Sequence, residues 1–200
     1  MPIDVKRVLE LHRETVDRWH REDIDDRYDG IYGTICRQHS YNFRLWHEED
    51  IARSRDVSDA QIAQVKRNID KLNQQRNDWI EQIDEWIVAD LRACRIAPII
   101  NAPLNTETPG SAIDRLSILA LRLYHLDEQL RRTDAGVEHL ASVRSKLQIG
   151  LRQQADLSQS LGQLLQEIYA GRKRQQTYRQ MKMYNDPQLN PYLYERRKAG

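Results

Sequence analysis

Residues 62–86 read IAQVKRNIDKLNQQRNDWIEQIDEW, and this stretch decides the fold. Its apolar side chains return at alternating steps of three and four residues, with Arg76 as the one polar intruder. The apolar positions are Ile62, Val65, Ile69, Leu72, Trp79, Ile83 and Trp86. Such a heptad pattern predicts a long amphipathic helix that packs against other helices. Ser58 and Gln61 fit a capping box, so we expect the helix to run from near Asp59 to about Ala93.

The remaining chain also favours helices. All six prolines lie outside residues 3–97 and 110–186, and an interior proline costs a helix about 3 kcal/mol. Thr108 and Pro109 are suited to start a helix that ends near Thr133, and Asp134 is suited to cap the next one. Apolar positions of that next helix are Leu140, Val143, Leu147, Leu157, Leu161, Leu164 and Ile168. With two shorter helices near 3–21 and 33–55, the pattern predicts an all-α bundle of five or six helices.

The length of 200 residues suits one helical domain, which we place at 1–171, followed by a basic, tyrosine-rich tail at 172–200. Charged residues make up 30% of the chain and the net charge is +1, so the overall charge indicates no particular partner. Cys36 and Cys94 form no disulfide or zinc motif, which favours a reducing, cytoplasmic setting. We expect no secretory signal and no membrane-spanning segment, since no apolar stretch approaches about 20 residues.

An aromatic residue, a histidine, any residue and two acids occur together three times. The copies are Trp19-His20-Arg21-Glu22-Asp23, Trp46-His47-Glu48-Glu49-Asp50 and Tyr124-His125-Leu126-Asp127-Glu128. On a helix, a histidine and the acid three positions later share a face, so each copy can present an imidazole and a carboxylate in one direction. The pattern therefore favours a metal site or an acid/base site.

We expect two of these copies to meet in one pocket of the bundle. The candidate metal ligands are His47, Asp50, His125 and Glu128. Without a divalent metal, a histidine there can act as an acid or a base. The candidate catalytic residues are His47, Glu49, Asp114, Arg115 and His125, with Asp114 and Arg115 orienting the others. The alternative is a purely structural network of histidine, acid and arginine, and His12 is expected to be a core histidine.

Candidate ligand-binding residues lie elsewhere. Arg76, with Asn42 and Asn77, is suited to grip a carboxylate or phosphate, although we prefer an internal ion pair between Arg76 and an acid. The loop before the helix at Pro109 is suited to hold a phosphate or sugar hydroxyls, and an ordinary capped loop explains it as well. Its candidate residues are Asn105, Thr106 and Glu107.

The tail from Arg172 to Gly200 holds eight Lys and Arg against two acids. Its bases, with Arg179 and Lys182 as candidate contacts, alternate with tyrosines, a composition suited to an anionic polymer such as a nucleic acid. Docking of the tail on the acidic body is the alternative that we prefer.

Four segments together resemble a bacterial family known as domain of unknown function 4254. They are HSYNFRLWHEEDIARS from His39, IAQVKRNIDKLNQQRNDWIEQID from Ile62, LNTETPGSAIDRLSILALRLYH from Leu104 and YRQMKMYNDPQLNPYLY from Tyr178. The resemblance implies a cytoplasmic bacterial protein linked to cell-envelope glycan assembly, and it implies no reaction. The copy at Trp19 lies outside these segments, so the resemblance favours a site built from two copies instead of three.

Two functions follow as hypotheses. The first is an enzyme or ligand-binding protein that acts near envelope glycan synthesis through the histidines and carboxylates. The second is a non-catalytic adaptor, or a protein that binds an anionic polymer, using the basic tail. No glycine-rich nucleotide loop, serine-hydrolase motif or zincin motif occurs in the sequence. The two heptad-bearing helices make a homodimer credible.

Overall fold

The computed structural model describes residues 3–180 and 188–190, and this part of the chain is an all-α bundle, as expected. Its five helices are α1 (Val5–Trp19), α2 (Gly30–Arg53), α3 (Asp59–Ala93), α4 (Pro109–Leu130) and α5 (Val137–Tyr169). The described residues include no strand and no helix that is long and apolar enough to cross a membrane.

The helix starts test the sequence signals directly. At α3 the capping box of Ser58 and Gln61 is present, and at α4 the Thr108 side chain accepts a hydrogen bond from the backbone of Ser111. Both predicted starts are therefore confirmed. The predicted cap Asp134 is wrong, because α5 begins after Gly136 without a side-chain cap. The Asp134 carboxylate instead pairs with Arg132 at 2.7 Å.

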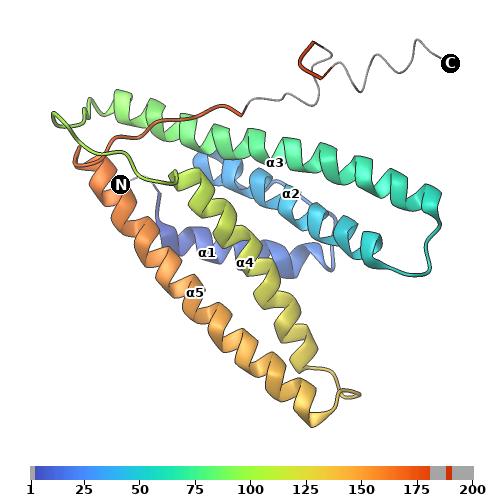
Figure 1. Cartoon of the computed structure of the whole chain (residues 1–200). Helices are drawn as coiled ribbons and strands as arrows, with labels where there is room; N and C mark the ends of the chain where they lie inside the picture. Colours follow the sequence, from blue (N-terminus) through green and yellow to red (C-terminus); the bar gives the residue numbers. More distant parts are fainter. Residues whose placement is uncertain (1–2, 181–187, 191–200) are drawn as a thin grey trace.

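Two helical hairpins make up most of the molecule (Figure 1). The helices α2 and α3 lie side by side, as do α4 and α5, and the hairpins diverge towards their far ends. The helix α1 packs against α4, α2 and α5 and so joins the hairpins. One core collects apolar residues from all five helices, and a smaller group around Leu45, Val65 and Ile69 holds the outer part of α2 against α3. The site described below therefore lies where the hairpins meet.

The proline-rich loop after α3 pairs with the chain that follows α5. The Ile99 amide donates to the Gly171 carbonyl at 2.9 Å, and the Arg174 amide donates to the Pro103 carbonyl at 3.0 Å. Gly171 has φ +70°, and a Cβ there would lie 2.7 Å from the Ala97 carbonyl oxygen. A glycine is therefore required where α5 ends against this loop.

The two glycines inside α5, Gly150 and Gly162, differ in how closely the neighbouring helix approaches them. A Cβ at Gly150 would lie 2.8 Å from Cδ2 of Leu123, so this glycine lets α5 approach α4. A Cβ at Gly162 would meet nothing within 4 Å. Only Gly150 is thus needed for the contact between the two helices.

Candidate functional site: a cluster of three histidines

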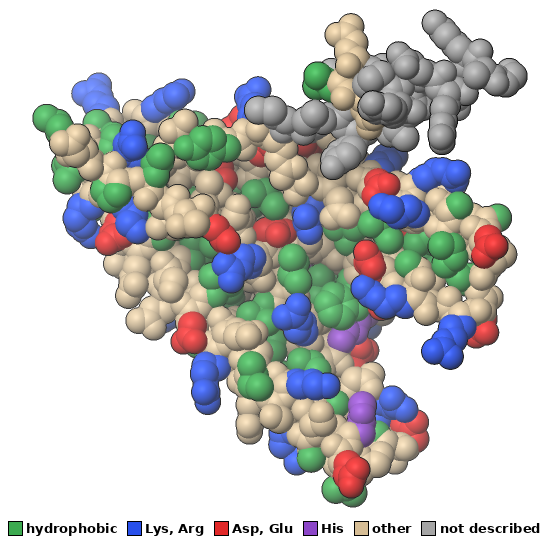
Figure 2. Space-filling view, viewed as in Figure 1, with side chains coloured by type: hydrophobic (Ala, Val, Ile, Leu, Met, Phe, Trp, Pro, Cys, Tyr) green, Lys and Arg blue, Asp and Glu red, His purple; other side chains and the backbone are tan. Residues whose placement is uncertain are grey.

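The three aromatic-histidine pairs of the sequence come together from three helices. The ring of His20, which follows the last residue of α1, lies 5.3 Å from that of His47 on α2 and 5.1 Å from that of His125 on α4. The rings of His47 and His125 are 6.1 Å apart. We call these three residues the histidine cluster. In Figure 2, histidine side chains reach the surface near the point where the hairpins diverge and on the outer part of the α4–α5 hairpin.

Aromatic side chains surround the cluster. Trp46 stacks on the His125 ring with 4.7 Å between centroids, and Tyr124 stacks on the His20 ring at 4.1 Å. The edge of Phe43 meets both His20 and His47, at 4.9 and 4.6 Å. Trp46 and Tyr124 thus each hold a histidine of another triplet, which helps to fix the ring orientations, whereas Trp19 stacks on His39 at 5.3 Å.

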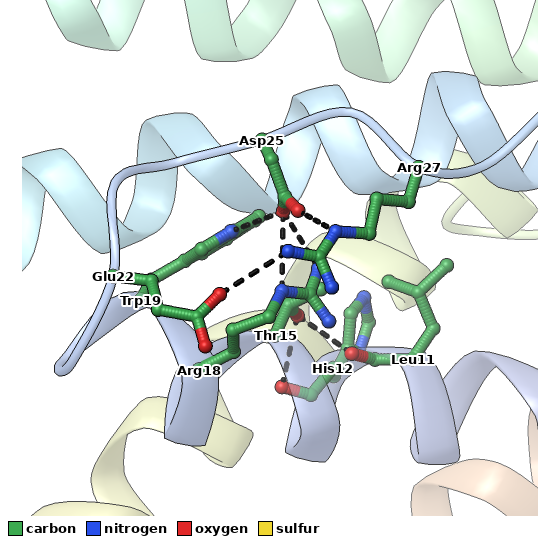
Figure 3. Close-up of polar contacts among 8 residues, drawn as sticks. All are labelled: Leu11, His12, Thr15, Arg18, Trp19, Glu22, Asp25 and Arg27. Atoms are coloured by element: carbon green, nitrogen blue, oxygen red, sulfur yellow. Dashed lines mark hydrogen bonds and ion pairs between the residues drawn. The ribbon is translucent and has the colours of Figure 1, made fainter.

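The loop after α1 is tied to the end of the helix by polar contacts just before His20 (Figure 3). Asp25 in that loop accepts hydrogen bonds from Nη2 of Arg18 at 2.7 Å and from Nε1 of Trp19 at 3.1 Å. Arg27 also pairs with Asp25. Because the guanidinium of Arg18 and the indole N–H favour the charged carboxylate against its burial, the pKa of Asp25 is lowered. This anchor holds the loop against the end of α1.

Two of the three imidazoles are oriented by an acceptor on one nitrogen. Nδ1 of His20 lies 2.7 Å from the Val16 carbonyl, and Nδ1 of His125 lies 2.7 Å from Oε2 of Glu128. Both acceptors require a proton on Nδ1, so the neutral rings leave Nε2 unprotonated. Nε2 of each ring is buried and has no hydrogen-bond partner among the described residues. The cluster therefore holds two acceptor nitrogens whose directions are fixed.

The third imidazole, His47, stays neutral more readily than an ordinary histidine. Its pKa is lowered, first by burial and then by the positive charge that His20 and His125 would carry, while Asp50 and Glu128 act in the opposite sense. A positive charge on His20 or His125 thus opposes protonation of His47.

A second polar group lies deeper in the same interface. Asp114 on α4 accepts hydrogen bonds from the side-chain amides of Gln38 at 2.6 Å and Asn42 at 2.8 Å, and Asn42 also donates to Ser117 at 2.8 Å. The Ser117 hydroxyl lies 2.6 Å from Nδ1 of His39. Burial raises the pKa of Asp114 and, with the neighbouring His12, lowers that of His39. Since His39 and Ser117 are fully buried, we assign this network to structure.

The predicted site residues divide between these places. His47, His125 and Glu128 lie together, whereas Asp50 is exposed at 57% and is 3.8 Å from Arg53. Glu49 also pairs with Arg53, at 2.9 Å. Among residues 3–180 and 188–190, no group of three or more histidine, cysteine or acidic side chains could hold a metal ion.

The predicted orienting residues, Asp114 and Arg115, lie nearer the N-terminal end of α4 than His125 does. Eleven residues separate Asp114 from His125, which is about 16 Å along a helix. Arg115 pairs instead with Glu107 at 3.1 Å. Asp114 therefore contacts Gln38 and Asn42 of α2, whereas His125 belongs to the histidine cluster.

The other predicted binding residues form separate contacts. Nε of Arg76 lies 3.9 Å from Asp114, which is the internal ion pair that the sequence favoured, and Asn77 donates to Gln180 at 2.8 Å. Arg179 pairs with Glu85 on α3 at 2.9 Å, so the described part of the tail docks on the bundle. Lys182 lies outside the described residues.

The loop before α4 borders a cavity of about 760 Å³, lined among others by Asn105, Thr106 and Glu107. The start of α4 already has an anion, because Oδ1 of Asp84 on α3 accepts a hydrogen bond from the Gly110 amide at 2.9 Å. Burial raises the pKa of Asp84 to about 6. The protein's own carboxylate thus occupies the helix end that the sequence suggested for a phosphate.

Two residues of these sites were not expected from the sequence. His20 joins the cluster although the family resemblance favoured two copies, and His39 is buried beside Ser117 although it was not a candidate residue. A possible signal for His20 was the triplet pattern itself. For His39 the signal was its spacing on α2 from Asn42 and Phe43, both of which are buried.

The architecture is thus an all-α bundle with a histidine cluster in the joint between two hairpins. The chain belongs to the family described as "Protein of unknown function (DUF4254)", whose model matches residues 33–177. His47 and His125 lie inside the matched residues, and His20 lies before them. No curated protein and no solved structure matches the chain.

Proposed function

We propose that this protein is a bacterial, cytoplasmic enzyme or ligand-binding protein whose site is the histidine cluster, and that it acts in cell-envelope glycan assembly. The observation that carries the site is the convergence of His20, His47 and His125, with ring centroids 5.1–6.1 Å apart and two buried Nε2 atoms unpartnered among the described residues. The glycan link rests on the family resemblance.

The chemistry that this arrangement favours is acid/base chemistry at His125. Glu128 accepts a hydrogen bond from the Nδ1–H group of His125 and so fixes the tautomer, while Trp46 holds the ring plane. An imidazole oriented by a carboxylate is the arrangement that hydrolytic and transfer enzymes use for a general base. A ligand hydroxyl entering between the rings would donate to Nε2 of His125 or His20.

Ligand screening by NMR tests the proposal. The untagged chain would be titrated with nucleotide sugars and sugar phosphates, with neutral sugars as the control, while the histidine side-chain signals are recorded. We expect a ligand that shifts the signals of His47 and His125 and that binds about tenfold or more weakly to His125→Gln and Glu128→Gln. The exposed His139→Gln is the matched control. Failure of every glycan precursor to bind, or binding that leaves the cluster signals and both variants unaffected, would refute the proposal.

The metal version, with His47, Asp50, His125 and Glu128 as ligands, stays a prediction. It is checked by metal analysis of untagged protein against the His47→Ala/His125→Ala double variant. About one equivalent of metal in the native chain and none in the variant would support it. Equal, negligible contents in both would remove it.

The adaptor function also stays a prediction, and the structure sharpens its test. Residues 172–180 contact the bundle through Arg179 and Glu85, so a chain ending at Gln180 keeps this contact while it removes the rest of the tail. Loss of partner or nucleic-acid binding in the shortened chain, with binding retained in His125→Gln, would favour the adaptor.

A further inference from the structure

A second cavity lies beside the histidine cluster, between α2, α3 and α4. Its volume is about 360 Å³, and its walls include Trp46 of α2, Asn73 and Arg76 of α3 and Arg122 of α4. This size is at the lower end of the range found for small-molecule sites, about 300–1,000 Å³. The cavity is separate from the loop cavity at the start of α4, which has other walls.

The wall of this cavity carries more positive than negative charge. It includes three arginines, Arg53, Arg76 and Arg122, and one carboxylate, that of Glu49. Arg53 pairs with Glu49 at 2.9 Å, so these two charges offset each other. Arg122 makes no ion pair with any residue in the described part of the chain. The positive charges of the other two guanidinium groups, those of Arg76 and Arg122, are not offset in this way.

Arg76 is only weakly compensated by the protein. Its nearest carboxylate oxygen, Oδ1 of Asp114, is 3.9 Å from Nε, a distance too long for a hydrogen bond. That same oxygen already accepts hydrogen bonds from Gln38 and Asn42. Nε of Arg76 is buried and has no hydrogen-bond partner among the described residues. A buried guanidinium N–H in this state favours an acceptor from outside the chain.

We propose that this cavity binds the oxyanion of a small ligand, a phosphate or a carboxylate, through Arg76 and Arg122. Guanidinium groups bind such oxyanions through paired N–H donors, which is the reason arginine predominates at these sites. The side chain of Asn73 adds a donor and an acceptor for neighbouring hydroxyls.

The cavity also has a direct neighbour in the histidine cluster. Trp46 lines the cavity and stacks on the His125 ring, so one aromatic side chain separates a bound anion from the pair of His125 and Glu128. The ligand class would thus be a small anionic molecule whose uncharged part extends towards Trp46. Anion binding itself does not require the chemistry proposed for His125, so the two proposals fail separately.

Calorimetry on the full chain tests the anion site. The probes are inorganic phosphate, glucose 1-phosphate and glucuronate, with glucose as the neutral control. We expect saturable binding of at least one anion, weakened by added salt. Tight binding of phosphate alone would identify the free ion as the ligand, whereas preference for glucose 1-phosphate or glucuronate would identify a phosphorylated or an acidic sugar.

Variants decide whether the arginines are responsible. We expect Arg122→Gln and Arg76→Gln each to weaken anion binding by about tenfold or more. Arg144→Gln on the exposed face of α5 is the matched control, and it should bind as the native chain does. Arg122 is exposed, so its replacement leaves the fold intact even if that of Arg76 does not. No binding of any anion, or binding that Arg122→Gln leaves unchanged, would overturn the proposal.

Discussion

Acid should destabilise the fold through His12. This histidine of α1 is fully buried, neither of its ring nitrogens has a hydrogen-bond partner in the described residues, and burial lowers its pKa from 6.5 to about 3. Below pH 6.5 the unfolded chain therefore binds a proton that the folded chain excludes. As the pH is lowered from 6.5 to about 3, the free energy of unfolding decreases. At about 1.4 kcal/mol per pH unit, His12 alone removes about 2 kcal/mol by about pH 5.

The variant His12→Leu isolates this contribution. Leucine has no group to protonate and gives up no hydrogen bond, so the free energy of unfolding at neutral pH should change by less than about 1.5 kcal/mol. Urea titrations followed by circular dichroism at several pH values give the difference between variant and native chain. We expect that difference to shift in favour of the variant by about 2 kcal/mol between about pH 7.5 and about pH 5. His139→Gln, at an exposed position, is the control. Parallel pH profiles for His12→Leu and the native chain would refute the reasoning.

Three further predictions concern the free energy of unfolding, measured by urea titration. Asp84→Asn should stabilise the chain above about pH 6 by up to about 3 kcal/mol. The reason is that the raised pKa of Asp84 favours folding only at low pH, and this contribution is lost as the pH rises from 3.8 to about 6. A variant no more stable than the native chain would contradict this. Gly150→Ala should destabilise by about 1–3 kcal/mol through its clash with α4, whereas Gly162→Ala should stabilise by about 0.5–1 kcal/mol. Equal effects at the two glycines would refute the packing assigned to them. Asp25→Ala should cost about 1–3 kcal/mol and Arg27→Ala, which removes an exposed partner, less than about 1 kcal/mol, and the reverse order would contradict the anchor at the end of α1.

The helices were predictable because their signals are local. The seam from Ile62 to Trp86, the capping box at Ser58 and the proline at Pro109 each act within a few residues, and α3 and α4 begin where these signals predict. Asp134 failed as a cap because its carboxylate had a nearby competitor, the guanidinium of Arg132. The spacing of apolar residues does not show whether the Asp134 carboxylate binds the backbone at a helix start or the nearby guanidinium of Arg132.

The candidate site was less predictable because it depends on how the helices cross. The triplets indicated that His47 shares a helix face with Asp50, and His125 with Glu128. The placement of His20 depends in addition on the anchor at Asp25 and on the packing of α1 against the two hairpins. On α2, Gln38 and His39 were not among the candidate residues, and both are fully buried against α4. Polar residues buried in a paired network carry no hydrophobic pattern to reveal them.

The pKa of His47 tests most directly whether the three imidazoles share one site. It can be followed by side-chain NMR during a pH titration of the native chain and of His20→Gln and His125→Gln. We predict a pKa below 6.5 in the native chain and a rise in each variant, because each removes a neighbouring charge that opposes protonation of His47. A pKa at the ordinary value in the native chain, unmoved in both variants, would show that the rings do not interact and would contradict the account.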